Sequence, residues 1–101
     1  MNYDVALVDG SLVGLAPLFD EAGDAAVDFW RQIQEALARL GADPYGLSRR
    51  ARMSTEQGRQ IYEFSCTLQG RQVNLVAEFH FGDDEQTLFV RRIVRERPLI
   101  L

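Results

Sequence analysis

The sequence contains no lysine, one cysteine, one histidine and no long apolar run, and each of these shortages excludes a class of protein. A single cysteine, Cys66, cannot form an internal disulfide. One cysteine and one histidine in the whole chain are also too few to build a zinc site of the usual kind. We therefore expect no metal and no cofactor. No apolar run approaches the ~20 residues that span a bilayer, and residues 12–19 follow no basic segment, so they do not form a signal-peptide core. The sequence predicts a cytoplasmic protein with no membrane association.

Length and composition predict one domain, but the charge is unevenly distributed along it. A chain of 101 residues, 47% of them hydrophobic, is sufficient for a single domain with one core, residues 1–101. Residues 1–48 carry eight acidic residues and two arginines, whereas the other nine arginines follow. Because arginine presents a planar fork of donors that suits phosphate, the second half is a candidate nucleic-acid surface. The net charge of −4 argues against a non-specific nucleic-acid binder.

The N-terminal half is expected to form a strand followed by a first helix. Residues 3–8 are a short apolar run closed by the turn signal Asp9-Gly10, which predicts a strand. Apolar residues then recur at helical spacing behind a candidate cap, Ser11: they are Leu12, Leu15, Phe19 and Ala22. Pro17 lies within this run, so the helix either kinks or begins late with Pro17 in its first turn. Gly23 fits its end.

A second helix has the clearest apolar periodicity in the chain, with Asp24 as its candidate N-cap. Its apolar stripe consists of Val27, Trp30, Ile33, Leu37 and Leu40. Gly41 follows the last of these residues and indicates the helix end. The short connection between the two helices predicts an antiparallel hairpin, and residues 42–48 are expected to form a loop.

From Gln60 the apolar period changes to two, which predicts a three-stranded antiparallel meander. If Gln69-Gly70 forms a two-residue turn, the apolar residues of the first two strands share one face. The opposed pairs are then Tyr62 with Ala77, Phe64 with Leu75, and Cys66 with Val73. The expected fold is therefore α+β, with an N-terminal strand, an antiparallel helical hairpin and the meander, and with the helices packed on one face of the sheet.

The pattern allows two registers for the last strand, residues 87–94. A four-residue loop at residues 83–86 would bring three apolar residues to the core face: Leu88, Val90 and Val94. It would also place Arg91 opposite Glu78 and Arg95 opposite Asn74 on the other face. A slip of one residue would instead bury Phe89 and Ile93. The sequence weakly favours the first register.

The order of these elements and three local motifs resemble the RelE/ParE superfamily of bacterial type II toxins. Residues 38–46 are similar to the end of the family's second helix and its following loop, residues 60–64 (Gln-Ile-Tyr-Glu-Phe) to one of its strands, and residues 92–97 to its basic terminal strand. The resemblance implies a RelE/ParE-like fold and a toxin that a cognate antitoxin neutralises. Members of the RelE branch are endoribonucleases that cut ribosome-bound mRNA without a metal, and members of the ParE branch inhibit DNA gyrase.

The chain departs from the family in two respects, and both favour a different function on the same scaffold. It ends Pro98-Leu99-Ile100-Leu101, where the family often has a tyrosine or lysine. It is also acidic and lacks lysine, whereas ribonuclease members are usually basic. The alternative to an endoribonuclease is a non-catalytic α+β protein-interaction module, which includes a ParE-like gyrase inhibitor.

Four residues are candidates for catalysis. Arg71 and Arg95 best match the family's phosphate-contacting positions, although an arginine at a hairpin turn is also unremarkable as a solvated residue. Glu63 and His80 share the open face of the expected sheet and are candidates for proton transfer. An ion pair with an arginine is the simpler interpretation of Glu63, and mere exposure the simpler one of His80.

The remaining arginines have mixed interpretations. Arg49, Arg50, Arg52 and Arg97 are candidates for nucleic-acid contact. Arg49, Arg50 and Arg52 could also contact an antitoxin, with a solvated charge run as the default, whereas function and simple solvation are equally good interpretations of Arg97. Arg91 has a structural explanation in a cross-strand pair, and such exposed pairs contribute about 0–1 kcal/mol. Cys66 belongs to the core-facing set and is expected to be an inert buried thiol.

Overall fold

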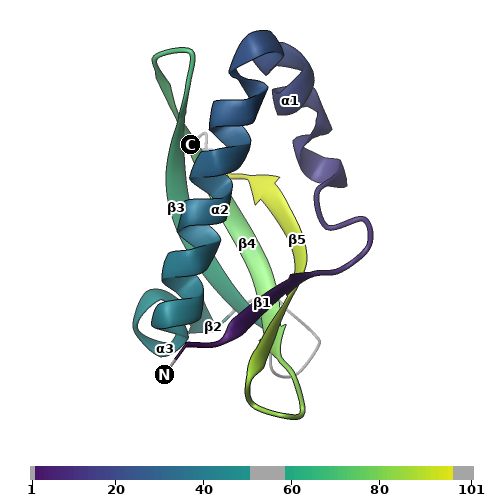
Figure 1. Ribbon diagram of the computed structural model, residues 1–101, viewed down its shortest axis with the longest axis vertical. Helices are drawn as coiled ribbons and strands as arrows, with labels where there is room; N and C mark the ends of the chain where they lie inside the picture. The colour runs from purple at the N-terminus through teal and green to yellow at the C-terminus, as the bar shows by residue number, and fades with distance from the viewer. Residues whose placement is uncertain (1, 51–58, 97–101) are drawn as a thin grey trace, which may run out of the picture.

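The chain folds into a layer of helices on one face of a mixed β-sheet (Figure 1). The computed structural model describes residues 2–50 and 59–96. In chain order the elements are β1 (Asp4–Leu7), a 3-10 turn (Val13–Leu15), α1 (Ala16–Ala22), a second 3-10 turn (Gly23–Ala25), α2 (Ala26–Ala42), α3 (Pro44–Leu47), β2 (Arg49–Arg50), β3 (Gln60–Leu68), β4 (Arg71–Phe81) and β5 (Thr87–Arg95). The predicted α+β class is confirmed.

The sheet contains five strands in the order β1-β5-β4-β3-β2, so both edges of the meander β3–β5 are extended. β1 runs parallel to β5, with Val5 opposite Leu88, and the other neighbours are antiparallel. The sheet is therefore mixed. The sequence indicated the first strand but not its neighbour, because pairing between distant segments leaves no local pattern in either one.

Helix α2 covers the sheet with a different face from the predicted stripe. Its buried residues are Phe29, Ile33, Ala36, Leu37, Leu40 and Gly41. The prediction is wrong for Val27, which is 81% exposed, and Trp30 is only partly buried. At 100° per residue, Val27 lies about 160° around the axis from Phe29. Once Phe29 faces the core, Val27 must face solvent.

Helix α1 begins late, with Pro17 in its first turn, and ends at Gly23, whose φ is 54°. Of the two alternatives for Pro17, the late start is thus confirmed. The two predicted side-chain caps are wrong. Asp24 lies inside the 3-10 turn that precedes α2, and the N-cap of α2 is Ala25, which has no side-chain cap. The first 3-10 turn follows Leu12 rather than Ser11 and also lacks a side-chain cap.

The predicted loop after α2 contains a short helix, α3. The Asp43 carboxylate accepts a hydrogen bond of 3.1 Å from the Gly46 backbone N–H, and Pro44 occupies its first turn. Proline there is pre-set for a helical φ and lacks an N–H that would be unsatisfied. The same Asp, Pro and Gly residues that favour a turn therefore also suit one turn of helix.

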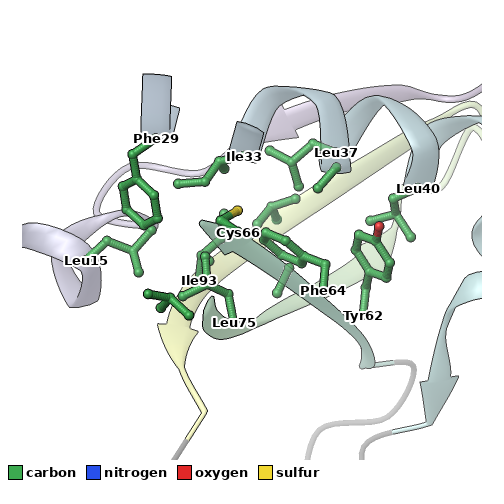
Figure 2. Packing of buried hydrophobic residues seen from close by; sticks show 14 of the residues in the cluster. Leu15, Phe29, Ile33, Leu37, Leu40, Tyr62, Phe64, Cys66, Leu75 and Ile93 are labelled. Atoms are coloured by element: carbon green, nitrogen blue, oxygen red, sulfur yellow. The ribbon is translucent and has the colours of Figure 1, made fainter. Parts of the chain in front are cut away.

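Side chains from both layers meet in one core (Figure 2). In Figure 2, Phe64 and Cys66 of β3 point toward Ile33 and Leu37 of α2. The residues with no exposed surface are Leu15, Phe29, Ile33, Ala36, Leu40, Leu75, Ala77, Phe79, Leu88, Val90 and Ile93. The predicted register of β3 on β4 is confirmed at all three of its pairs.

A β-bulge divides β5 into two registers. Phe79 lies opposite Val90, as the first of the two registers predicted, but the next pair is Glu78 with Arg92. Arg91 is the extra residue of the bulge, because it lies between the two registers without an opposite partner. The predicted pairing of Arg91 with Glu78 is therefore wrong.

Beyond the bulge, the facing of β5 side chains also differs from the prediction. Ile93 is fully buried, whereas Val94, predicted in the core, is only partly buried. Arg95 lies opposite Leu75, not opposite Asn74. Since opposed residues share a face in an antiparallel pair, Arg95 lies on the helix-covered side of the sheet and not on the open side.

The bulge lies where the connection between β1 and α1 crosses β5. The Ile93 N–H donates to the Ser11 carbonyl at 2.9 Å. Gly14 allows the close approach, because a Cβ there would lie 3.2 Å from both the Ile93 carbonyl oxygen and Val94 Cγ1. The connecting segment thereby satisfies a backbone N–H of β5 beyond the last residue that pairs with β1.

Candidate anion-binding site

Arg71 and Arg95, from adjacent strands, line one cavity of about 270 Å³. Its other lining residues are Leu18, Glu21, Leu68, Gln69 and Val73. The floor is apolar and continuous with the core, since Leu18, Leu68 and Val73 are buried. The rim carries two cations and one carboxylate. Charged and polar side chains therefore dominate the surface of this cavity.

The position of each arginine follows from the backbone before it. Arg71 is the first residue of β4 and follows the Gln69-Gly70 turn, in which both residues have positive φ, 51° and 78°. Alternation then places Arg71 on the same face as Val73. Arg95 reaches that face only because of the bulge. Without the extra residue Arg91, Arg95 would lie on the open face, as the single register predicted.

A second cavity of about 740 Å³ adjoins the first along α1. It is lined by Gly14, Pro17, Leu18, Glu21, Val94, Arg95 and Glu96. The two cavities share Leu18, Glu21 and Arg95, and so form one groove between α1 and the end of β5. In Figure 1, α1 and the end of β5 lie in the same half of the molecule as the β3–β4 turn.

The side chain of Gln69 ties α1 to this site. Its Nε2 donates to the backbone carbonyls of Glu21 at 3.3 Å and Ala22 at 3.5 Å. Both carbonyls lie in the last turn of α1, where C=O groups have no partner within that helix. The bonds hold Glu21 next to the turn that carries Arg71.

Among the residues that the structure describes, no direct contact neutralises the charges in the cavity. Within residues 2–50 and 59–96, Arg71, Arg95 and Glu21 take part in no ion pair within 4.0 Å. By contrast, Arg31 and Arg92 each pair with a carboxylate. Two guanidiniums and one carboxylate line the cavity of about 270 Å³, an excess of positive charge that favours an anion. The adjoining part of the groove adds a second carboxylate, Glu96.

Glu63 and His80 lie on the opposite side of the sheet from this cavity. Their neighbours along the strands, Tyr62, Phe64 and Phe79, face the core, so alternation places Glu63 and His80 on the open face. The His80 ring stacks on Phe89, with ring centroids 5.4 Å apart. Of the four candidate catalytic residues, the structure therefore brings Arg71 and Arg95 together and separates both from Glu63 and His80.

The open face has its own charged cluster, centred on Glu78. Arg92 donates from Nε and Nη2 to the two carboxylate oxygens, each at 2.8 Å, and Arg59 Nη1 lies 3.4 Å from Oε2. The hydrogen bonds from Arg92 lower the pKa of Glu78, and the charges of both arginines act in the same direction against partial burial. The structural role expected for Arg91 thus belongs to Arg92.

Of the other candidate residues, the structure describes the backbone of two. Arg49 and Arg50 form β2, opposite Ile61 and Gln60 of β3, and Arg52 and Arg97 lie outside the described residues. Cys66 is 3% exposed, so its expected place in the core is confirmed, and burial raises the pKa of its thiol.

A third cavity, about 350 Å³ in volume, lies between β1 and α2. Its lining residues are Tyr3, Asp4, Val5, Leu7, Trp30, Gln34, Leu37 and Ala38. β1 pairs with β5 on one side only, so within the described chain its other edge has no neighbouring strand. The groove therefore lies beside an open sheet edge.

Comparisons with known proteins found no matching family model, no matching characterised protein and no matching solved structure. Among the described residues, no group of three or more histidine, cysteine or acidic side chains is placed to hold a metal ion. None of the described helices combines the length and apolar character needed to cross a membrane.

One residue of the site, Glu21, was not recognised from the sequence. It lies in α1, far along the chain from both arginines, and it has no motif around it. Only the docking of α1 against the β3–β4 turn brings it to the cavity. The sequence did contain a signal for the bulge. The step from Val90 to Ile93 is three residues, and it interrupts the period of two that resumes from Ile93 to Arg95.

Proposed function

We propose that this chain is the toxin of a type II toxin–antitoxin pair of the RelE/ParE kind, and that it cuts ribosome-bound mRNA with Arg71 and Arg95 on the phosphate. One observation carries the proposal: the two arginines singled out as phosphate contacts, from different strands, line the same cavity. Neither is paired with a carboxylate among the described residues. The α+β architecture with helices on one sheet face is compatible with the scaffold.

The chemistry suits these residues. Metal-free RNA cleavage proceeds by attack of a ribose 2′-hydroxyl on the neighbouring phosphorus, and negative charge develops on the phosphoryl oxygens. Guanidiniums fixed near that position stabilise the charge where it forms. Their hydrogen bonds to phosphate are charge-assisted and directional, which a lysine would not reproduce.

The test is expression of the protein alone in a bacterium. We expect growth arrest, and we expect Arg71→Ala and Arg95→Ala each to relieve it. Arg31→Ala is the matched control, because Arg31 is exposed and bonded to Asp28 and Glu35 on α2. Mapping mRNA 5′ ends in arrested cells identifies a nuclease, whereas loss of DNA supercoiling identifies a gyrase inhibitor. Normal growth with abundant soluble protein would contradict the proposal for that host.

A second candidate function, a non-catalytic protein-interaction module, is favoured by the separation of Glu63 and His80 from the arginines. The groove beside β1 is suited to such a role, since an extended partner segment can add to an open sheet edge. A cognate antitoxin is one such partner. A stable complex without growth arrest, lost on Leu7→Asp in β1 and kept in Arg95→Ala, would support this alternative instead.

A further inference from the structure

We infer that Glu21 accepts the proton of the ribose 2′-hydroxyl next to the phosphate that Arg71 and Arg95 hold. The inference rests on the proposed function and assigns it a catalytic base. Glu21 is the carboxylate residue that lines both parts of the groove, together with Arg95. Glu63 and His80, the candidates that the sequence offered for this role, lie across the sheet.

The fold holds the backbone of Glu21 at the groove, and its side chain is exposed. The Gln69 side chain bonds to its backbone carbonyl, and the neighbouring residue Leu18 is buried in the cavity floor. Because no described cation lies within 4.0 Å of the carboxylate, its oxygens remain available to accept a hydrogen bond. A carboxylate already paired with Arg71 or Arg95 would be a much weaker acceptor.

The combination of charges selects a particular ligand chemistry. The two guanidiniums attract the anionic group, and the carboxylate beside them can in addition accept a hydrogen bond from a ligand that carries a donor next to that group. RNA has that arrangement, because every 3′-phosphate is adjacent to a 2′-hydroxyl, and DNA lacks it. The site is therefore built for a ribonucleotide phosphodiester.

The reaction step balances without a further reactant. The 2′-oxygen forms a bond to phosphorus while its proton passes to the Glu21 carboxylate, and the bond from phosphorus to the 5′-oxygen breaks. The leaving 5′-oxygen takes a proton from solvent water. The products are a 2′,3′-cyclic phosphate and a 5′-hydroxyl, and the two arginines hold the phosphoryl oxygens throughout.

The experiment compares Glu21→Gln with Asp20→Asn, which removes the same charge at the exposed preceding residue. Single-turnover cleavage is measured with an mRNA bound to purified bacterial ribosomes. Binding is measured with the same mRNA carrying a 2′-deoxy nucleotide at the cleaved position. A general base contributes about 10²–10⁴-fold to a rate. We therefore expect Glu21→Gln to slow cleavage by at least ~100-fold and to remove the fall in rate at acid pH, with binding changed less than about threefold.

Asp20→Asn should cleave like the parent protein, and Glu21→Asp, which keeps the carboxylate on a shorter side chain, should give an intermediate rate. If Glu21→Gln cleaves at the parent rate while Arg71→Ala and Arg95→Ala do not cleave, the inference is overturned and the proposed function stands. Equal loss of binding and cleavage in Glu21→Gln, with an unchanged melting temperature, also overturns it. A parent protein that does not cleave at all overturns both.

Discussion

Arg92 and Glu78 form a two-pronged ion pair across β4 and β5, with both hydrogen bonds at 2.8 Å. The Glu78 side chain is 15% exposed and that of Arg92 is 58% exposed, so solvent screens the pair on one side only. The Arg92 hydrogen bonds hold the pKa of Glu78 below its ordinary value, and the Arg59 charge adds to the effect. This ion pair links β4 to β5 next to the bulge, on the open face of the sheet.

Glu78→Gln should lower the stability of the protein in a pH-dependent way. Because the Glu78 pKa is lower in the folded than in the unfolded state, its ionisation favours folding above the unfolded pKa of about 4.3. That contribution is lost as pH falls through the folded pKa. We expect the variant to be less stable by about 1 kcal/mol at neutral pH and indistinguishable from the parent once Glu78 is protonated.

Urea unfolding of parent and variant at neutral pH and at a pH below the ordinary glutamate pKa measures the effect. Glu35→Gln is the control, since Glu35 makes an ion pair on the exposed face of α2 with a side chain 53% exposed. Its effect should be smaller. A difference between parent and Glu78→Gln that is the same at both pH values would contradict the electrostatic explanation.

Cys66 should be unreactive in the folded protein. Burial raises the pKa of its thiol, an effect that the Arg39 charge partly opposes, and the residue is 3% exposed. Because the thiolate is the nucleophile, reaction with an aromatic disulfide reagent should require opening of the sheet. We expect it to be at least ~100-fold slower than in urea. Ser65→Cys in a Cys66→Ala background places a thiol on the open face and should react rapidly. Fast labelling of Cys66 itself would show that β3 opens readily.

Gly41→Ala should destabilise the protein, although alanine is the better helix former. A Cβ on Gly41 would lie 2.8 Å from the Tyr3 carbonyl oxygen and 3.1 Å from Val5 Cγ2, and the Gly41 carbonyl already accepts a 2.8 Å bond from the Tyr3 N–H. The cost of this steric overlap outweighs the ~1 kcal/mol gain in helix propensity. We therefore expect the free energy of unfolding to fall by roughly 1–3 kcal/mol. Gln34→Ala, on an exposed part of α2, should change stability by less than about 0.5 kcal/mol. Equal stability of Gly41→Ala and parent would mean that β1 moves away from α2 at little cost.

The parts of the fold predicted from the sequence are those fixed by local chemistry. The Gln69-Gly70 turn and the alternation on either side of it determine the register of β3 on β4, and each supports the other. The phase of α2 was harder to predict. Val27 and Phe29 are both apolar, and the choice between them depends on what α1 presents, since Phe19 packs edge-on against Phe29 at 5.3 Å between ring centroids.

The candidate site depends on relationships that the sequence does not contain. The last strand follows one register at Val90 and another at Ile93, so no single register could be correct. The bulge occurs where Ser11 and Gly14 meet β5, and that contact joins distant parts of the chain. The bulge also places Arg95 on the same face of the sheet as Arg71. The sequence therefore predicts each arginine separately as a phosphate contact, but it does not predict that the two line one cavity.

The same pair of arginines should make the stability of the protein depend on phosphate. An anion that binds the folded state stabilises it by about 1.4 kcal/mol at ten times its dissociation constant, which in a domain of this size raises Tm by roughly 5–10 °C. We expect inorganic phosphate to raise Tm above that in chloride at equal ionic strength. Arg71→Ala or Arg95→Ala should remove most of this increase, because each deletes one of the two cations at the cavity.

In phosphate-free buffer these variants should unfold at the parent temperature or slightly above it, since no described carboxylate loses a partner. Arg31→Ala should keep the full phosphate response, and a response that survives in Arg95→Ala would place the anion elsewhere on the protein.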